Sequence, residues 1–141
     1  METKERTVIT IGATIQSSME KVWECWSEPK HIVHWNNASP DWHTPKAEND
    51  LKVNGTFTYT MAARDGSMSF DFGGTYTKVE KFKRIEYIMN DGRKAKNDFQ
   101  PLGDRVKVVV TFEAESENSI ELQRGGWQAI LDNFKQYVQS K

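Results

Sequence analysis

The sequence has one cysteine, four prolines and no long apolar run among its 141 residues. A single thiol, Cys25, cannot close an internal disulfide, so we expect a reducing compartment and a cytoplasmic location. An apolar run such as residues 108–110 is far too short to cross a bilayer, which excludes membrane insertion through a helix. Residues 1–6 contain no apolar stretch, and we therefore expect no secretory signal peptide.

The chain also lacks an excess of charge of either sign. Its net charge is −1 and its pI is near 6.3, which argues against a nucleic-acid partner. The basic residues at 81–84 and 93–96 fall at strand ends or on outward positions, where a solvated face is the simplest interpretation. The length is that of one domain, residues 1–141, and is sufficient for one hydrophobic core.

Leucine is scarce: there are four leucines against ten valines and eight isoleucines. β-Branched side chains favour a sheet over a helix bundle. The chain is, by contrast, rich in rings, with five Trp, four Tyr and seven Phe. Rings of this size need either a thick core or a cavity that they can line.

The first part of the chain predicts one strand and two short helices. Residues 7–15 alternate, with Ile9, Ile11 and Ile15 on the inward parity of a strand. Ser17 and Glu20 fit a capping box that would begin the first helix, and Pro29 suits the first position of the second. We expect residues 36–50, which contain Pro40 and Pro45, to form a loop.

The middle of the chain predicts a run of antiparallel strands. Alternating patterns or hairpin signals place strands at residues 56–61, 68–79, 85–89, 94–100 and 105–113. Turns are expected at 64–67, 90–92 and 101–104. Within the second of these strands, Gly73 and Gly74 indicate a bulge or a sharp bend.

The last segment changes to a helical period. Its apolar stripe consists of Trp127, Ile130, Leu131, Phe134 and Val138. Asn118 and Glu121 form a second candidate capping box. Residues 125–126 are two glycines in the helix interior, which cost about 1 kcal/mol each relative to Ala. We expect either a close approach to the sheet or a ligand, or a local kink, to account for them.

One long helix must bury its apolar stripe, and the strands offer the only large apolar face. The sequence therefore predicts an α+β fold with a curved antiparallel sheet wrapped around the C-terminal helix. Short motifs in the same order support a family resemblance. They are MEKVW at 19–23, HW at 34–35, DLKVNGTF at 50–57, MAARDGS at 61–67, GGTY at 73–76, RIEY at 84–87 and GW at 126–127.

With these motifs the chain resembles the START-like or SRPBCC superfamily, which has the helix-grip fold. Within it, the chain is most similar to the family named after the activator of the ATPase of the ninety-kilodalton heat-shock chaperone. The resemblance implies a helix-grip fold, a cavity for hydrophobic ligands, and an enzymatic activity in only some members. Fold by itself does not give function.

The rings and methionines on inward parities are the candidate lining of a ligand cavity. Met is flexible enough to adapt to varied apolar ligands. The alternative is that these side chains simply fill a packed core. The candidate set is Trp35, Phe57, Tyr59, Met61, Met68, Phe70, Phe72, Tyr76, Tyr87, Met89, Asn97, Phe99, Phe112, Gln123, Trp127 and Phe134.

Asn97 departs from the family pattern, which has Val-Glu-Val before an aromatic residue. It shares its parity with Ala95 and Phe99, so we expect its amide to face inward. A buried amide needs a partner. That partner is a protein group, with Tyr76, Tyr87 and Gln123 as candidates, a water molecule, or a polar atom of a ligand.

The sequence offers little support for catalysis or a metal. No Gly-x-Ser-x-Gly motif is present, and we expect Cys25 to be a small residue packed in the core. His31, His34 and His43 lack a fixed fourth ligand, so we expect no metal and no cofactor. Three functions follow in order of preference: non-catalytic binding of a small hydrophobic or amphipathic molecule, a co-chaperone acting on a heat-shock chaperone, and an enzyme acting on a cavity-bound substrate.

Overall fold

The structure, a computed structural model, describes residues 7–141. Residues 1–6, on which the signal-peptide expectation rests, lie outside the described part. The elements, in chain order, are β1 (Val8–Ile15), α1 (Met19–Ser27), α2 (Pro29–Trp35), β2 (Trp42–Asn49), β3 (Thr56–Ala63), β4 (Ser69–Glu80), β5 (Arg84–Met89), β6 (Lys94–Leu102), β7 (Arg105–Glu113) and α3 (Ile120–Gln139).

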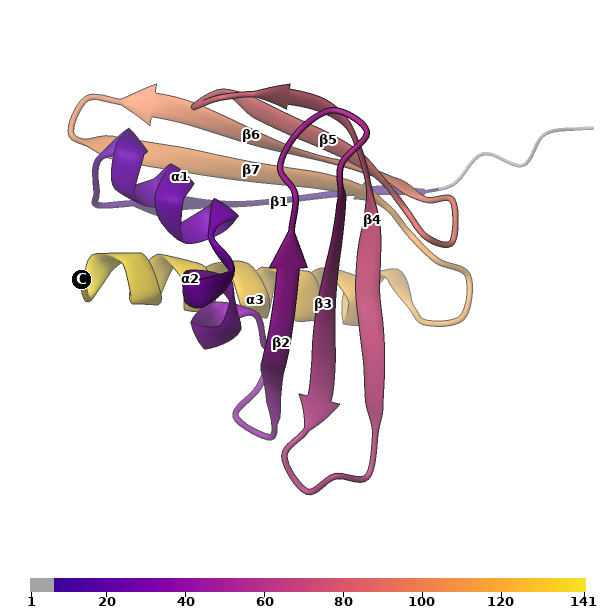
Figure 1. The fold of residues 1–141 in the computed structure, drawn as a ribbon. Coiled ribbons are helices and arrows are strands. Elements are labelled where there is room, and N and C mark those ends of the chain that lie inside the picture. Colours follow the sequence, from indigo (N-terminus) through magenta and orange to yellow (C-terminus); the bar gives the residue numbers. More distant parts are fainter. Residues whose placement is uncertain (1–6) are drawn as a thin grey trace, which may run out of the picture.

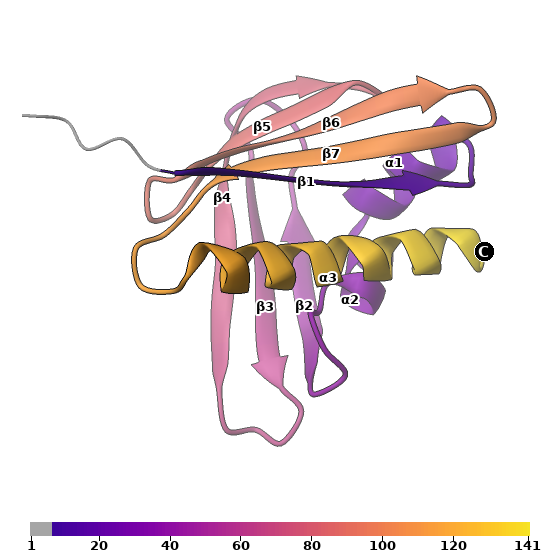
Figure 2. The same cartoon turned by 180° about the vertical axis from the view of Figure 1, so that it is seen from behind.

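The strands form a 7-stranded antiparallel sheet in the order β1-β7-β6-β5-β4-β3-β2. The sheet is strongly bent: β1, β7, β6 and β5 run across one side of the molecule, while β2, β3 and β4 run in a different direction down another side (Figure 1). α3 lies in the bend, along β1 (Figure 2). The predicted α+β helix-grip architecture is confirmed.

The expected loop at residues 36–50 is wrong in part, because β2 occupies Trp42–Asn49 and pairs with β3. Pro45 lies where the register with β3 shifts, between His43 and Lys46. A proline cannot donate to a strand ladder, so it is tolerated at an irregular place on an edge strand. The alternation rule failed here because this strand buries few of its side chains.

Of the two alternatives expected at Gly73 and Gly74, a bulge or a sharp bend, the bulge is wrong, because β3 pairs with both glycines in continuous register. The irregularity lies later in β4, between Tyr76 and Lys78. The two glycines instead allow neighbouring strands to approach closely. A Cβ atom at Gly74 would lie 2.5 Å from the carbonyl oxygen of Ile88, well inside van der Waals contact.

Both predicted helix caps are off by one residue. α1 begins after Ser18, whose hydroxyl accepts a hydrogen bond from the Lys21 N–H. α3 begins after Ser119, whose hydroxyl accepts from the N–H of Leu122. A serine in each case takes the position at which its oxygen can satisfy a free N–H of the first turn.

α3 packs on β1 and, near its C-terminal end, on α1 and α2. The predicted inward residues of β1 are buried: Ile9 and Ile15 fully, and Ile11 nearly so. The fully buried side chains that form this packed core are Ile9, Ile15, Val22, Cys25, Ile32, Ile85, Val106, Val108, Phe112, Phe134 and Val138. No helix in the described part of the chain combines the length and the apolar character needed to span a bilayer.

Candidate functional site

A cavity of about 440 Å³ lies between the N-terminal half of α3 and the bent sheet. Its volume is within the range of small-molecule sites, roughly 300–1,000 Å³. More of its lining residues are aromatic than aliphatic. The lining consists of Ile11, Trp26, Trp35, Asn36, Ala38, Trp42, Phe57, Tyr59, Met61, Phe70, Phe72, Tyr76, Tyr87, Arg93, Asn97, Val110, Glu115, Asn118, Leu122, Gln123, Gly126, Trp127, Ile130 and Leu131.

One wall of the cavity is a cluster of rings on β3, β4 and β5. Phe57 is at its centre, with ring centroids of Tyr59, Phe72, Tyr76 and Tyr87 between 5.0 and 5.6 Å away. Alternation on each strand places these rings on one face, and the pairing of β4 with its neighbours aligns them. The five rings therefore pack on one another, and all of them line the cavity.

The opposite wall comes from the helices. Trp26 of α1 stacks on Trp35 of α2 with centroids 5.2 Å apart. The indole N–H of Trp35 donates to the Cys25 carbonyl oxygen at 2.9 Å. Phe134 of α3 packs edge-on against both tryptophans. The two indoles are therefore fixed by contacts on their far side and present a rigid apolar surface to the cavity.

The hydroxyl groups of the tyrosine wall are held neutral. Burial raises the pKa of Tyr59, Tyr76 and Tyr87 above the usual tyrosine range. The Tyr76 hydroxyl donates to the side-chain oxygen of Asn49 at 2.5 Å. These groups therefore offer hydrogen bonds rather than charge to a bound molecule.

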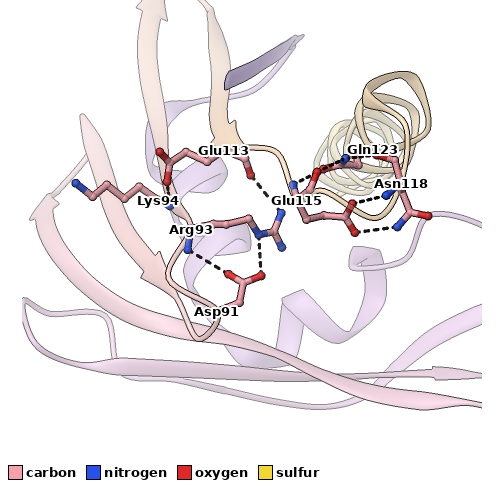
Figure 3. Close-up of polar contacts among 7 residues, drawn as sticks. All are labelled: Asp91, Arg93, Lys94, Glu113, Glu115, Asn118 and Gln123. Carbon is pink, nitrogen blue, oxygen red and sulfur yellow. Dashed lines mark hydrogen bonds and ion pairs between the residues drawn. The ribbon is translucent and has the colours of Figure 1, made fainter. Parts of the chain in front are cut away.

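The polar end of the cavity is built from the β5–β6 turn, the β7–α3 loop and the start of α3, whose polar contacts are drawn in Figure 3. Arg93 Nε donates to the Asp91 carboxylate at 2.8 Å, and Nη1 donates to the Glu113 carbonyl oxygen at 3.2 Å. Glu115 accepts from the backbone and side-chain N–H groups of Asn118. The Asn118 backbone N–H lowers the pKa of Glu115, which stays ionised.

Gln123 lines the cavity, but its amide closes the β7–α3 loop. Its Oε1 accepts from the Glu115 N–H at 2.9 Å, and its Nε2 donates to the carbonyl oxygens of Glu115 and Asn118 at 3.1 and 2.8 Å. Sequence reasoning proposed this side chain as a partner for Asn97. The structure gives it a structural role instead, because all of these bonds fix the entry to α3.

Asn97 faces inward, as its parity predicted, and it is 3% exposed. It lies in the middle of β6, paired with Ile85 of β5 on one side and Val110 of β7 on the other. Its Oδ1 atom has no hydrogen-bond partner among residues 7–141. No group among residues 7–141 therefore bonds this oxygen, which belongs to a residue of the cavity lining.

The structure places most of the sequence-predicted set in the cavity lining. Ring and apolar members from α2, β3, β4, β5 and α3 are brought together there. The predicted residues that line it are Trp35, Phe57, Tyr59, Met61, Phe70, Phe72, Tyr76, Tyr87, Asn97, Gln123 and Trp127.

Five predicted residues do not line the cavity, and covering rings explain three of them. Phe112 lies under Trp127, whose ring stacks on it at 3.8 Å. Phe99 is covered by Trp23 at 5.1 Å and by Trp26. Phe134 is fully buried against the tryptophans of the helices. Their inward parity was correct, but another side chain stands between each of them and the cavity.

The other two are Met68 and Met89. Met68 is 63% exposed because it precedes β4, which begins at Ser69, and so has no inward face to occupy. Met89 is buried at the end of β5 and packs into the core. Neither is among the residues that line the cavity.

Sequence reasoning missed several lining residues, above all Arg93 and Leu122. Arg93 was assigned to a solvated face, but its side chain is 13% exposed and folds back toward Glu113. Leu122, 63% exposed, and Phe70, 49% exposed, lie where the cavity reaches the surface. No local pattern marks these residues, since their position depends on how the sheet bends.

The glycines of α3 do not approach another part of the protein. An added Cβ at Gly125 or Gly126 would have no heavy atom within 4 Å. α3 continues through both as a regular helix. Gly126 lines the cavity while Gly125 is exposed. The expected close approach to the sheet is wrong, and the glycine at 126 leaves the cavity space open.

The three histidines do not form a ligand cluster among the described residues. His31 lies with Glu24 and Glu28, and their candidate ligand atoms are within 4.8 Å of one another. His34 on α2 and His43 on β2 are not part of this group. His31 Nε2 lies 3.2 Å from the exposed Glu24 carboxylate, an ordinary surface ion-pair geometry.

A bent antiparallel sheet that holds one long helix over an aromatic cavity defines the helix-grip class of the START-like superfamily. A family model described as "Activator of Hsp90 ATPase homolog 1-like protein" matches residues 16–139. The chain belongs to this family. A comparison with curated proteins gave no match.

Solved structures agree with this assignment. The solution NMR structure of the AHSA1-like protein from Aeromonas hydrophila is 45% identical, with a TM-score of 0.89 over 95% of this chain and 93% of that one. Chr148 from Cytophaga hutchinsonii is 53% identical, with a TM-score of 0.82 over 94% and 92%. CV1439 from Chromobacterium violaceum, at 20% identity and a TM-score of 0.83 over 94% and 98%, shares the fold.

Proposed function

We propose that this protein binds a small hydrophobic or amphipathic molecule, without chemical conversion, in the cavity between α3 and the sheet. The observation that carries the proposal is the 440 Å³ space walled by rings from β3, β4, β5 and the helices. A packed interior leaves few voids larger than a water molecule. A cavity of this size with apolar walls and a small polar end is the usual form of a ligand site.

The driving force would come from burial of apolar ligand surface, worth about 25 cal/mol per Å² before ordering costs. The walls need little reordering on binding. Trp26 and Trp35 are stacked on each other, and the Trp35 N–H is already bonded. Trp127 is stacked on Phe112. A preformed lining of this kind loses little side-chain entropy when a ligand enters.

Native mass spectrometry of protein purified from its own cells tests the proposal. The expected spectrum contains a non-covalent adduct that disappears on denaturation. The chain offers a matched pair of variants. Gly126→Leu places a side chain in the cavity, whereas Gly125→Leu places the same side chain on the exposed face of the same turn.

Loss of the adduct from Gly126→Leu alone, with Gly125→Leu retaining it, is the result that the proposal predicts. Equal retention by both variants would place the molecule elsewhere on the protein. Adduct-free spectra for wild type, together with no binding of apolar probes by calorimetry, would contradict the proposal.

The family description favours a second candidate, a co-chaperone that stimulates a heat-shock chaperone ATPase. The two functions differ in the surface they need. A co-chaperone acts through an exposed interface, so Gly126→Leu inside the cavity should leave stimulation unchanged. An ATPase assay with the chaperone of the same organism distinguishes them: stimulation by wild type and Gly126→Leu alike would favour the co-chaperone function.

A further inference from the structure

The floor of the cavity contains one acceptor that the protein does not satisfy. Asn97 Oδ1 has no partner among residues 7–141, and the residue is only 3% exposed. Its neighbours across β5 and β7 are Ile85 and Val110, which cannot donate. Buried polar atoms in folded proteins are nearly always hydrogen-bonded, so an orphan beside a cavity calls for a donor from outside the chain.

Three of the polar side chains that line the same cavity donate elsewhere. The Tyr76 hydroxyl donates to Asn49 Oδ1. The Gln123 amide donates to two carbonyl oxygens of the β7–α3 loop. The Asn36 amide donates to the Thr44 hydroxyl at 3.2 Å. Reassigning any of them to Asn97 would break a bond that positions a loop or an edge strand.

The charges at the polar end do not favour an anion. Arg93 is already bonded to the Asp91 carboxylate and to the Glu113 carbonyl oxygen. Glu115, whose carboxylate is ionised, lines the same end of the cavity. A ligand carboxylate entering here would meet a guanidinium that is already paired with a carboxylate, and a second negative charge of its own sign.

We infer that the molecule bound in this cavity is an uncharged alcohol or phenol with an apolar, ring-sized body, whose hydroxyl group donates to Asn97 Oδ1. This inference rests on the proposed function and adds to it the chemical class of the ligand. The body lies between the Phe57 ring cluster and the tryptophans of the helices. The hydroxyl is the specificity determinant, because a site built for a donor discriminates against analogues that lack it.

Isothermal titration calorimetry at neutral pH with three matched probes tests the inference: 2-naphthol, 2-methoxynaphthalene and 2-naphthoate. The ring system is the same in all three, and only the polar group differs. The methoxy oxygen cannot donate, and the naphthoate is an anion. Wild-type protein should bind 2-naphthol about tenfold more tightly than 2-methoxynaphthalene, the size of one buried hydrogen bond. 2-Naphthoate should bind most weakly.

Asn97→Leu should remove the preference by weakening 2-naphthol about tenfold while 2-methoxynaphthalene binds as well as before or better. A thermal melt shows whether the variant folds. The comparison of the three probes on wild-type protein tests the inference even if the variant does not fold. Ser27 Oγ, a second buried oxygen lacking a partner among residues 7–141, lies outside the cavity lining. Ser27→Ala is therefore the matched control and should leave all three affinities unchanged.

The possible outcomes distinguish failure of the proposed function from failure of the inferred ligand class. No binding of any probe would overturn the proposed function and this inference with it. Binding of 2-naphthol and 2-methoxynaphthalene with equal affinity, unchanged in Asn97→Leu, would overturn the inference and leave the proposed function standing. Tightest binding of 2-naphthoate would also overturn it, because the cavity would then select an anion.

Discussion

The two ends of the interior contain the same kinds of residue, but one end is tightly packed and the other encloses a cavity. At the end formed by β1, β7, α1 and the C-terminal half of α3, side chains such as Ile15, Val106 and Phe134 are fully buried and packed. At the end formed by β3, β4, β5 and the N-terminal half of α3, the rings of Phe57 and Phe72 line a cavity. We call these the packed end and the cavity end.

The difference lies in how α3 packs on the sheet and not in residue type. α3 packs directly on β1, whereas it makes few contacts with β2, β3 and β4. α3 also changes character along its length. Its cavity end contains Gly125 and Gly126, with open space beside both, and its packed end contains Leu131, Phe134 and Val138.

The largest effect should follow a Phe→Ala change at the packed end. Phe134→Ala removes a fully buried ring between two tryptophans, and we expect a loss of about 3–5 kcal/mol in the free energy of unfolding. Phe70→Ala removes a half-exposed ring at the cavity mouth and should cost less than about 1 kcal/mol. Urea denaturation measures both. Equal losses would break the distinction between the two ends.

Alkaline pH should lower the stability of the protein through the buried tyrosines of the cavity end. Because burial raises the pKa of Tyr59, Tyr76 and Tyr87 in the folded state, they stay neutral when the unfolded chain begins to ionise near pH 10. Below about pH 10 these tyrosines are protonated in both states, so they do not change the free energy of unfolding with pH. Above about pH 10 the unfolded state binds fewer protons than the folded state. Stability therefore falls by up to about 1.4 kcal/mol per pH unit for each tyrosine.

Denaturant titrations at several alkaline pH values, with tyrosine ionisation followed by absorbance, measure this dependence. Tyr87→Phe should reduce the slope. Ionisation of all tyrosines near pH 10 without loss of structure would show that the cavity wall is open to solvent.

Alanine in place of either glycine of α3 should stabilise the protein by about 1 kcal/mol, because it restores helix propensity and the added methyl group meets nothing within 4 Å. Gly126→Ala and Gly125→Ala should therefore behave alike in thermal unfolding. A destabilised Gly126→Ala with a stabilised Gly125→Ala would mean that the cavity end is closed in solution.

Strand parity was sufficient to predict much of the fold. Ile9, Val108 and Asn97 all face inward as their alternation predicted. The pattern failed where a strand buries little, as in β2, and where a residue precedes its strand, as at Met68. The capping boxes were misplaced by one residue because serine and asparagine stand side by side with other cap formers in the sequence.

The cavity itself was only half predictable. Alternation told which rings face inward, but it could not tell Phe72, which lines the cavity, from Phe112, which lies beneath Trp127. That distinction depends on the position of Trp127 on α3, which covers Phe112 on β7 and leaves Phe72 on β4 at the cavity. Arg93 was missed for a similar reason: its side chain turns inward through bonds to Asp91 and Glu113 that local sequence does not specify.

Methyl NMR spectra recorded during a titration with 2-methoxynaphthalene test the central claim most directly. The account predicts shifts for methyl groups of the cavity lining, such as Ile11, Met61 and Leu131, and unchanged signals for Ile15 and Val106 at the packed end. Shifts centred on the packed end, or spectra that do not change at saturating probe, would contradict it.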